Sequence, residues 1–365
     1  MKVAFIGDQD GFNYESIGGV ENYMRRLAFD LVSLGCSIDM FFLNAKKQSI
    51  TKVSDQIILH YEIANSHTID KVLTDFDVVL PVYLSFFSRL VFLFKVIIGN
   101  KRGIIVKILF NWQDNGIKRF IYFFEAMVMA GTIICLSNRQ FKYLDRLSYL
   151  GKIKPSVVPP PVPNSYFESE VDKLESFRSD SIEVVFVGRL DFGKGIDEVI
   201  TIMESLSDDP RYRCSIYGIF FPQDLYGRKI HEELTNQNSI SYFPIERSNF
   251  SEKLEYETGN ILKKAHIFLQ PYKKISSTVD APLLIYEAMA ALCLVVSRNI
   301  GDLQVIVGSD EYLLDDLPEK DFIYQAVQKI KSIDKMAFRD EVRRVSQMNT
   351  AFKDIRVADT IIEGF

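Results

Sequence analysis

The chain has 365 residues, 47% of them hydrophobic and 25% charged, which is long enough for two domains and too apolar for a disordered protein. Its four cysteines are scattered among apolar runs and form no CxxC pair, which excludes a disulfide framework and a zinc-binding cluster. The net charge of −5 is uneven, because residues 1–154 carry 19 Lys and Arg against 14 Asp and Glu. This basic, aromatic-rich half favours contact with an anionic ligand or membrane surface, although a chance imbalance on solvated faces explains it equally well.

No targeting or membrane-spanning segment is predicted. The N-terminal apolar run is too short for a signal peptide, and charged residues interrupt the most apolar region, residues 83–110, whereas a span needs about 20 mostly uncharged residues. We therefore expect a cytoplasmic protein. The basic charge is expected to gather on one face near the aromatic residues from Tyr83 to Phe124, and to hold the protein peripherally on the inner face of the membrane.

Strands and helices alternate from the first residues. A strand at 2–7 leads through a glycine-containing loop to a helix at 18–35, which Gly35 caps, and a strand at 37–43 follows. This order implies a parallel sheet with right-handed crossovers. The next elements are a helix at 138–151 and strands at 56–63, 78–84, 103–110 and 131–137.

Five prolines lie between Pro155 and Pro163. Such a run can be neither a helix nor a central strand, so it predicts a hinge. The same alternation then starts again, which predicts two doubly wound α/β domains in tandem. The second set has strands at 182–188, 214–218, 239–243, 266–271 and 293–297, and helices at 196–206, 254–265 and 282–292.

The stretch "VGRLDFGKGID", residues 187–197, joins a strand to a helix. In open α/β sheets, ligands bind beyond the carboxyl ends of the strands. The glycines Gly188 and Gly193 would let backbone N–H groups approach an anion, and the helix N-terminus adds partial positive charge. Arg189 is suited to hold a phosphate bidentately, and Lys194 to act as a point charge. The turn predicts a phosphate or diphosphate site, with a tight turn carrying solvated basic side chains as the alternative.

The same residues satisfy the pattern G-x-x-x-x-G-K. However, Gly195 stands where a P-loop needs Ser or Thr to hold Mg²⁺, and the pattern lies in the middle of the chain. A P-loop NTPase is therefore a weaker alternative.

Three segments occur in a characteristic order: "GGVENYMRRLAFDLVSLG", the basic turn, and "APLLIYEAMAALCLVVS". Together they resemble the retaining glycosyltransferases of family 4. The resemblance implies the GT-B fold, with two Rossmann-like doubly wound parallel-sheet domains that face a cleft. Residues 1–160 would form the acceptor domain, to which residues 346–365 return, and residues 161–345 the nucleotide-sugar domain.

The same resemblance implies a hexosyltransferase of cell-surface polysaccharide synthesis. It would use a nucleotide sugar, with UDP favoured over GDP, and would move the sugar with retention to a glycan or lipid-linked acceptor. Neither a cofactor nor a metal is expected, because two cations replace the metal, and nucleic acid is not an expected partner.

The resemblance also assigns roles to residues. Arg189 and Lys194 would bind the donor diphosphate and stabilise the leaving group. Glu287, expected to open its helix, would accept hydrogen bonds from the ribose hydroxyls. Gly18 and Gly19 match a first-domain loop that faces the donor phosphates or the acceptor, and a plain helix start is their alternative.

The sequence departs from the family at two places. Val279 stands where the family carries a Glu that contacts the donor sugar, and the adjacent Asp280 is the candidate to replace it. The first domain also lacks a histidine near residues 106–116, and His266 is expected to be structural. These departures keep open a second reading, in which the protein binds nucleotides but is catalytically inactive.

Overall fold

The computed structural model describes residues 1–9, 14, 18–63, 65–98, 103–110, 124–125, 128, 132–145, 154–178, 180–246, 252–274, 279, 281–353 and 355–363. The chain divides into two compact units. Unit 1 draws its residues from Met1–Tyr14, Gly18–Pro161 and Ile355–Phe365, and unit 2 draws its residues mainly from Val162–Asp354.

Unit 1 is built on an eight-stranded sheet with the order β3-β4-β2-β1-β5-β6-β7-β8. Only the β3–β4 pair among these strands is antiparallel. The strands are β1 (Lys2–Asp8), β2 (Ser37–Leu43), β3 (Ser49–Lys52), β4 (Ile57–Tyr61), β5 (Val78–Pro81), β6 (Ile104–Leu109), β7 (Thr132–Cys135) and β8 (Lys154–Val157).

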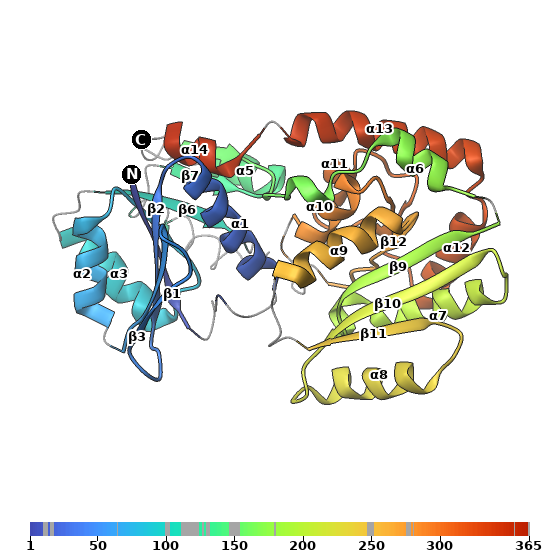
Figure 1. Cartoon of the computed structure of the whole chain (residues 1–365), viewed down its shortest axis with the longest axis horizontal. Coiled ribbons are helices and arrows are strands. Elements are labelled where there is room, and N and C mark those ends of the chain that lie inside the picture. Colours follow the sequence, from blue (N-terminus) through green and yellow to red (C-terminus); the bar gives the residue numbers. More distant parts are fainter. Residues whose placement is uncertain are drawn as a thin grey trace. The chain divides into compact units, whose positions relative to one another are not determined.

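Helices cover both faces of this sheet, with α2 and α3 on one side and α1 on the other (Figure 1). The apolar positions of α1 are buried, and Gly35 beyond its end has φ of +84° and donates its N–H to Val32, as expected of a capping glycine. The final helix α14 packs against α1. The helices are α1 (Gly19–Ser33), α2 (Asn65–Asp75), α3 (Phe86–Ile98), α5 (Asn138–Asp145) and α14 (Val357–Glu363).

The proline-rich run begins with a strand that the sequence did not predict. Pro155 lies in β8 and is paired with Ile133 of β7. Because β8 is the last strand of the sheet, one side of it needs no ladder hydrogen bonds, so an edge strand tolerates proline where a central strand does not.

Unit 2 has a six-stranded sheet with the order β11-β10-β9-β12-β13-β14, and all of its pairs are parallel. Helices α7 and α8 lie on one face, and α9 and α10 on the other (Figure 1). The strands are β9 (Ile182–Arg189), β10 (Tyr212–Phe220), β11 (Ser241–Glu246), β12 (Ile267–Leu269), β13 (Leu294–Arg298) and β14 (Leu313–Leu314). The helices are α6 (Glu170–Ser176), α7 (Ile196–Ser207), α8 (Leu225–Asn236), α9 (Glu252–Lys264), α10 (Leu283–Ala290), α11 (Leu303–Val307), α12 (Glu319–Lys331) and α13 (Lys335–Lys353), with short 3₁₀ turns η2 (Asn164–Tyr166) and η3 (Phe192–Lys194).

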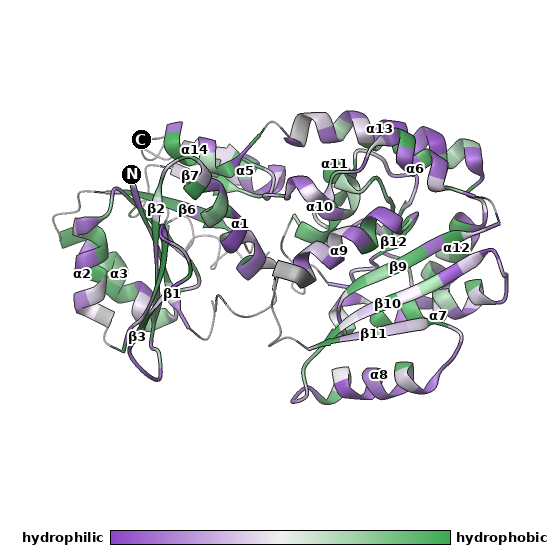
Figure 2. Cartoon of the chain, in the orientation of Figure 1, coloured by the Kyte–Doolittle hydropathy of each residue, from purple (hydrophilic) through white to green (hydrophobic). Residues whose placement is uncertain are grey.

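The two cores lie along the central strands. Residues 3–6 of β1 are fully buried, and β9 is buried over most of its length. Strands covered by helices on both faces read as continuous apolar runs, and β1 and β9 are accordingly green in Figure 2. All four cysteines are buried and free, as predicted. None of the described helices is long and apolar enough to cross a membrane.

Candidate functional site

The sheet of unit 2 changes its winding direction beside β9. From β9 the chain proceeds to β10 and β11 on one side, whereas β12, β13 and β14 lie on the other. The loops that leave the carboxyl ends of β9 and β12 lead to α7 and α10, which lie on opposite faces (Figure 1). Loops that part in this way open a crevice beyond the strand ends, which is where α/β sheets bind their ligands.

The basic turn occupies this position. β9 ends at Arg189, η3 spans Phe192–Lys194, and α7 begins at Ile196. The Asp191 carboxylate caps η3 by accepting the N–H of Lys194 at 3.0 Å. The turn therefore carries two cationic side chains at the carboxyl end of β9, where the sequence predicted them.

Arg189 and Lys194 lie close enough to affect each other electrostatically. The Arg189 side chain is 44% exposed and forms an ion pair with Asp191 at 3.0 Å. The Lys194 ammonium lies over the ring of Tyr272, 4.5 Å from its centre. Burial and the charge of Arg189 lower the pKa of Lys194 to about 7, against the opposing effect of Asp191. Two cations held together in a partly dry site are complementary to a ligand with two adjacent negative charges.

The backbone of the turn is partly committed to its own hydrogen bonds, whereas the predicted role of Gly188 and Gly193 toward an anion stays a prediction. The N–H groups of Lys194 and Gly195 are donated inside the turn, to Asp191 and to the carbonyl of Phe192, so they do not form an anion cradle. Gly195 has φ of +72°, and a Cβ there would lie 2.1 Å from the carbonyl oxygen of Pro271. Gly195 is required for this close approach between the turn and the segment after β12. Gly193 is buried, and its carbonyl accepts the N–H of Lys273.

The segment after β12 contributes polar groups that the sequence analysis did not single out. Gln270 is fully buried beside Gly188, and among the described residues neither polar atom of its side-chain amide has a hydrogen-bond partner. Buried amides without partners are rare in proteins and often lie where a ligand or water completes them. The sequence signal that could have identified Gln270 is a polar side chain at the carboxyl end of a short apolar strand. That strand, β12, pairs with β9, so the glutamine lies beside the basic turn.

Lys273 holds the turn in place through ion pairs with two carboxylates and a contact with an aromatic ring. Its ammonium binds Asp197 at 2.5 Å and Glu319 at 2.9 Å, and it lies over the ring of Phe192. Burial alone would lower the pKa of Lys273, but the hydrogen bonds to these two carboxylates raise it above its ordinary value. Because its partners hold it charged and in place, Lys273 fixes η3 and the start of α7 rather than offering a free cation.

Glu287 is not at the start of its helix. α10 begins at Leu283, so Glu287 lies in the second turn, and the predicted benefit from the helix dipole does not apply there. The side chain is 2% exposed. The helix itself begins within one residue of the predicted range 282–292, so only the placement of Glu287 at its start is wrong. Val279 is half-buried, and Asp280 lies outside the described residues.

In unit 1, Gly18 and Gly19 form the start of α1. Gly18 is the N-cap, and a Cβ on it would lie 2.1 Å from a carboxylate oxygen of Glu21. No heavy atom lies within 4 Å of a Cβ built on Gly19. The Glu21 carboxylate thus lies beside this helix N-terminus. That Gly18 and Gly19 face the donor phosphates or the acceptor stays a prediction.

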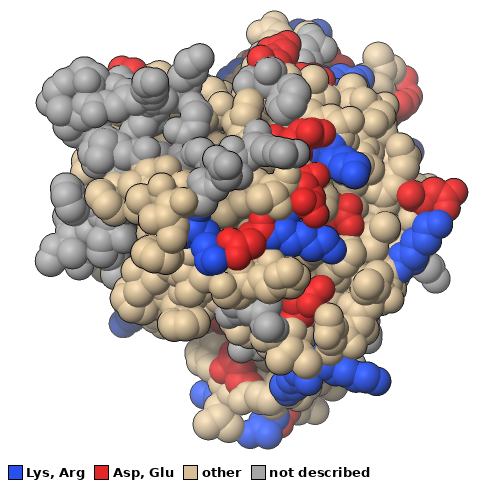
Figure 3. All heavy atoms as spheres, turned by 90° about the vertical axis from the view of Figure 1, so that its left-hand side faces the viewer, with Lys and Arg blue, Asp and Glu red and all other residues tan. Residues whose placement is uncertain are grey.

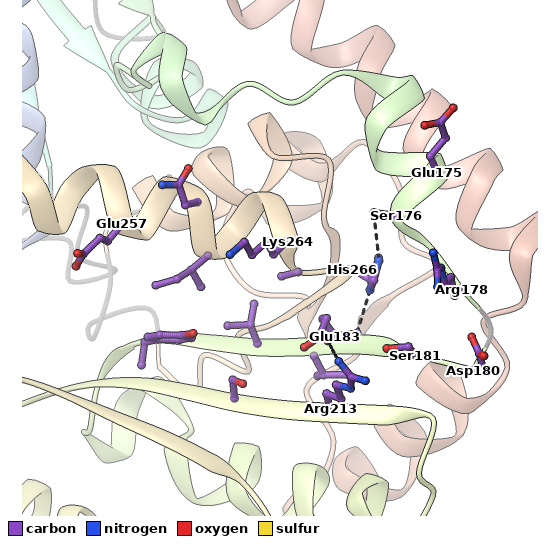
Figure 4. Close-up of a pocket in the computed structure, with 17 residues that line it drawn as sticks. Glu175, Ser176, Arg178, Asp180, Ser181, Glu183, Arg213, Glu257, Lys264 and His266 are labelled. Atoms are coloured by element: carbon purple, nitrogen blue, oxygen red, sulfur yellow. Dashed lines mark hydrogen bonds and ion pairs between the residues drawn. The ribbon is translucent and has the colours of Figure 1, made fainter.

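A cavity of about 1030 Å³ lies elsewhere in unit 2, beside the first residues of β9 and β10 (Figure 4). Its labelled residues carry both signs of charge, and His266 is held between the hydroxyl of Ser176 and the N–H of Glu183. Burial and Lys173 lower the pKa of His266 to about 4, so the ring is neutral and agrees with a structural role. This cavity lies at the opposite ends of the strands from Arg189, and it contains none of the predicted site residues. The described residues include no cluster of His, Cys, Asp and Glu that could hold a metal.

Residues 168–339 match the family described as glycosyl transferases group 1. The matched segment lies inside unit 2 and contains the basic turn, Gln270 and Glu287. Among curated protein sequences, none matches the chain.

Solved structures resemble the chain over nearly its whole length. Anabaena HepE in complex with UDP has 14% identity and a TM-score of 0.67, with 100% of both chains covered. Sucrose-phosphate synthase from Thermosynechococcus elongatus has 16% identity and a TM-score of 0.64, covering 97% of this chain and 98% of its own. The pneumococcal O-GlcNAc transferase GtfA, in complex with UDP and GlcNAc, has 11% identity and a TM-score of 0.66, covering 100% and 97%. At these identities the likeness establishes the fold, and the predicted GT-B fold is confirmed.

Proposed function

We propose that the protein is a metal-independent glycosyltransferase that takes a sugar from a UDP-sugar and transfers it, with retention, to a glycan or lipid-linked acceptor. The observation that carries this proposal is the pair Arg189 and Lys194 at the carboxyl ends of β9 and β12, within the segment that matches the glycosyltransferase family. UDP in the structures of HepE and GtfA supports a uridine nucleotide as the donor.

The two cations act on the leaving group. As the bond between the anomeric carbon and the diphosphate oxygen breaks, negative charge accumulates on that oxygen. Arg189 and Lys194 are fixed before the reaction, so they stabilise this charge without reorganising. Burial, and then the charge of Arg189, lower the pKa of Lys194, so a diphosphate beside this ammonium would stabilise its charged form.

No protein side chain needs to act as a nucleophile in the proposed transfer. The acceptor oxygen bonds to the anomeric carbon on the face that the diphosphate leaves, and the acceptor proton passes to the leaving phosphate oxygen. UDP and the glycosylated acceptor are the products. Glu287 accepts hydrogen bonds from the ribose hydroxyls, and the amide of Gln270 takes a polar group of the donor beside Gly188.

The proposal is tested by its products. Purified protein is incubated with UDP-sugars and a mixed set of glycan and lipid-linked acceptors, with and without EDTA, and released UDP is measured. We expect acceptor-dependent release of UDP that survives EDTA. Release of UMP, or metal-dependent release of phosphate from ATP or GTP as in a P-loop NTPase, would contradict it.

The inactive alternative rests on Val279, which offers the donor sugar no hydrogen bond where the family has a carboxylate. It predicts that UDP raises the melting temperature, because UDP at 100 times its Kd adds about 2.7 kcal/mol to the free energy of unfolding. It also predicts that no UDP-sugar is turned over with any acceptor. Binding without turnover across the acceptor set would favour that alternative over the transferase.

A further inference from the structure

The outer face of α3 is unusually apolar. Six large side chains of this helix are each 49–78% exposed, and no charged or polar side chain lies among them. α3 is largely green in Figure 2, whereas the surface helix α8 is mostly purple. The six residues, which we call the α3 ridge, are Phe86, Phe87, Leu90, Phe94, Ile97 and Ile98.

The outer face of α3 departs from the normal pattern of a surface helix, because it is as apolar as the inner face. The positions that face the core are Ser88, Phe92 and Val96, so the inner face includes a hydroxyl while the outer face has none. A helix that only covers a sheet presents polar residues to water. Contiguous exposed apolar surface of this kind marks a site of interaction, because leaving it in water costs free energy.

The basic residues of α3 lie on its flanks and are paired. Arg89 forms an ion pair with Glu125 at 3.2 Å, and Lys95 with Asp70 at 2.6 Å. Figure 3 shows this end of unit 1, where Lys and Arg alternate with Asp and Glu beside an uncharged area. The sequence predicted a basic face near Tyr83 to Phe124, but four of its cations, Lys101, Arg102, Lys118 and Arg119, lie outside the described residues, so that face stays a prediction. Among the described residues of α3, the feature that a membrane could contact is the apolar ridge.

Two occupants fit an apolar ridge, a second copy of the chain or a lipid bilayer. Residues 1–154 carry 19 basic and 14 acidic residues, so two copies joined through this region would bring like net charge together. A bilayer surface is either neutral or anionic and imposes no such repulsion. The long side chains of Arg89 and Lys95 can also stay at headgroup level while the ridge inserts.

The place of α3 in the fold agrees with a lipid surface. α3 follows β5 closely and begins near the carboxyl edge of the sheet, the edge at which α/β domains bind ligands. A small cavity lined by Arg89 and by Lys107 of β6 lies at the same edge. A lipid-linked acceptor of the proposed reaction would thus reach unit 1 from the surface on which α3 rests.

We propose that α3 is an interfacial anchor that lies parallel to a lipid bilayer and inserts the α3 ridge at the headgroup–acyl boundary. Insertion of an apolar helix face to this depth is the mode of amphipathic surface helices. Because the ridge is uncharged and its flanking cations are paired, binding depends on apolar burial far more than on lipid charge or salt. The anchor does not depend on transferase activity.

The test uses the full chain and vesicles of phosphatidylcholine alone or with phosphatidylglycerol, at low and high salt. We expect wild-type protein to co-sediment with both vesicle types, with a partition coefficient that salt changes by less than about threefold. The triple variant F86S/F94S/I97S should lose at least about tenfold in that coefficient. Its three positions are exposed, so its melting temperature should equal or exceed that of wild type.

A matched control removes exposed apolar groups from unit 2. Val171, Tyr324 and Met336 are 61–66% exposed, so V171S/Y324S/M336S should bind vesicles like wild type. Three results would overturn the proposal: equal binding of the α3 triple variant, wild-type binding only to anionic vesicles at low salt, or an α3-dependent dimer in solution that ignores vesicles. UDP affinity of the α3 variant reports separately on the proposed donor site and should be unchanged.

Discussion

Donor binding should take up a proton at Lys194. In the free protein, burial and the positive charge of Arg189 lower the pKa of this ammonium to about 7. A diphosphate beside the ammonium would favour its charged form and raise the pKa again. The protein with bound UDP therefore holds more protons than the free protein, and affinity must fall as pH rises above the pKa of the free state.

The size of the effect follows from this pKa. At pH 7 about half of the free Lys194 is charged, so binding takes up about half a proton, and at pH 8 about nine-tenths. Above pH 8 the Kd for UDP should rise by about tenfold per pH unit, which is about 1.4 kcal/mol, until the pKa of the bound state is reached. Above about pH 8 the diphosphate of UDP is fully ionised, and titrations kept at or below pH 8.5 leave the uracil N3–H protonated, so neither group contributes to the slope there.

Isothermal titration calorimetry measures both quantities. Titrations of UDP between pH 7 and 8.5, in buffers that differ in ionisation enthalpy, give the Kd and the number of protons taken up. The slope of log Kd against pH should approach one, and proton uptake should increase over the same interval.

Two variants control the interpretation. Lys194→Arg keeps a permanent charge, so its Kd, although weaker because of altered geometry, should not change with pH. Lys194→Met removes a cation whose lowered pKa opposes folding near pH 7, so the ligand-free variant should melt at a higher temperature while losing UDP affinity. A flat pH profile for wild type, or a steep one for Lys194→Arg, would show that Lys194 is not the group that meets the diphosphate.

Three further substitutions probe the turn and its neighbours. Arg189→Ala should weaken UDP binding by about 1.5–3 kcal/mol, whereas Arg211→Ala, which removes a similarly exposed Arg–Asp pair, should leave the Kd unchanged in the same titration. Gly195→Ala should destabilise the protein by more than about 1 kcal/mol in denaturant unfolding, because its Cβ would clash with Pro271 at φ of +72°, whereas Gly19→Ala should be neutral or slightly stabilising because its site is open. Gln270→Leu should raise the melting temperature, because it removes a buried amide, and should weaken UDP-sugar binding; an unchanged Kd would remove Gln270 from the site.

Several central elements could be predicted from sequence because their pattern was complete locally. The strand at 37–43 has the predicted bounds, and α1 has its apolar face and its glycine cap where expected. These elements follow from the spacing of apolar residues, which sets the face that the core covers. The strand β8 could not be predicted, because whether Pro155 is tolerated depends on the edge position of its strand, and that depends on the whole sheet.

The orientation of α3 could not be predicted from its sequence either. Its sequence is apolar at inner and outer positions alike, so it shows no contrast from which a helix could be oriented. From sequence, the region was predicted to be too charged for a membrane span and to form part of a basic face on a membrane surface, but its exposed apolar face was not predicted. Two of the charges that excluded a span, Arg89 and Lys95, are paired on the flanks of the helix, which leaves the outer face of α3 free of charge.

At the candidate site, residue types were easier to predict than their roles. Arg189 and Lys194 are basic residues that directly follow a predicted strand, so the sequence alone placed them at its carboxyl end, whereas the lowered pKa of Lys194 comes from burial that only the fold shows. The role of Gly195 could not be read from the turn, since it depends on Pro271, which is distant in the sequence. Gln270 and Lys273 were missed for the same reason, because only the pairing of β12 with β9 brings them to the turn.

Val279 bears on what the donor sugar contributes to binding. Its half-buried, apolar side chain accepts no hydrogen bond, whereas a carboxylate at that position would take hydroxyl groups of the sugar. If neither Asp280 nor Gln270 binds the sugar, donor affinity under the proposed function comes from the diphosphate at Arg189 and Lys194 and from the ribose at Glu287, all parts that UDP shares with every UDP-sugar. Free UDP should therefore bind nearly as tightly as the donor and inhibit as product. Discrimination among sugars then rests on the reacting geometry, because a site that binds all UDP-sugars alike can distinguish them only in the transition state.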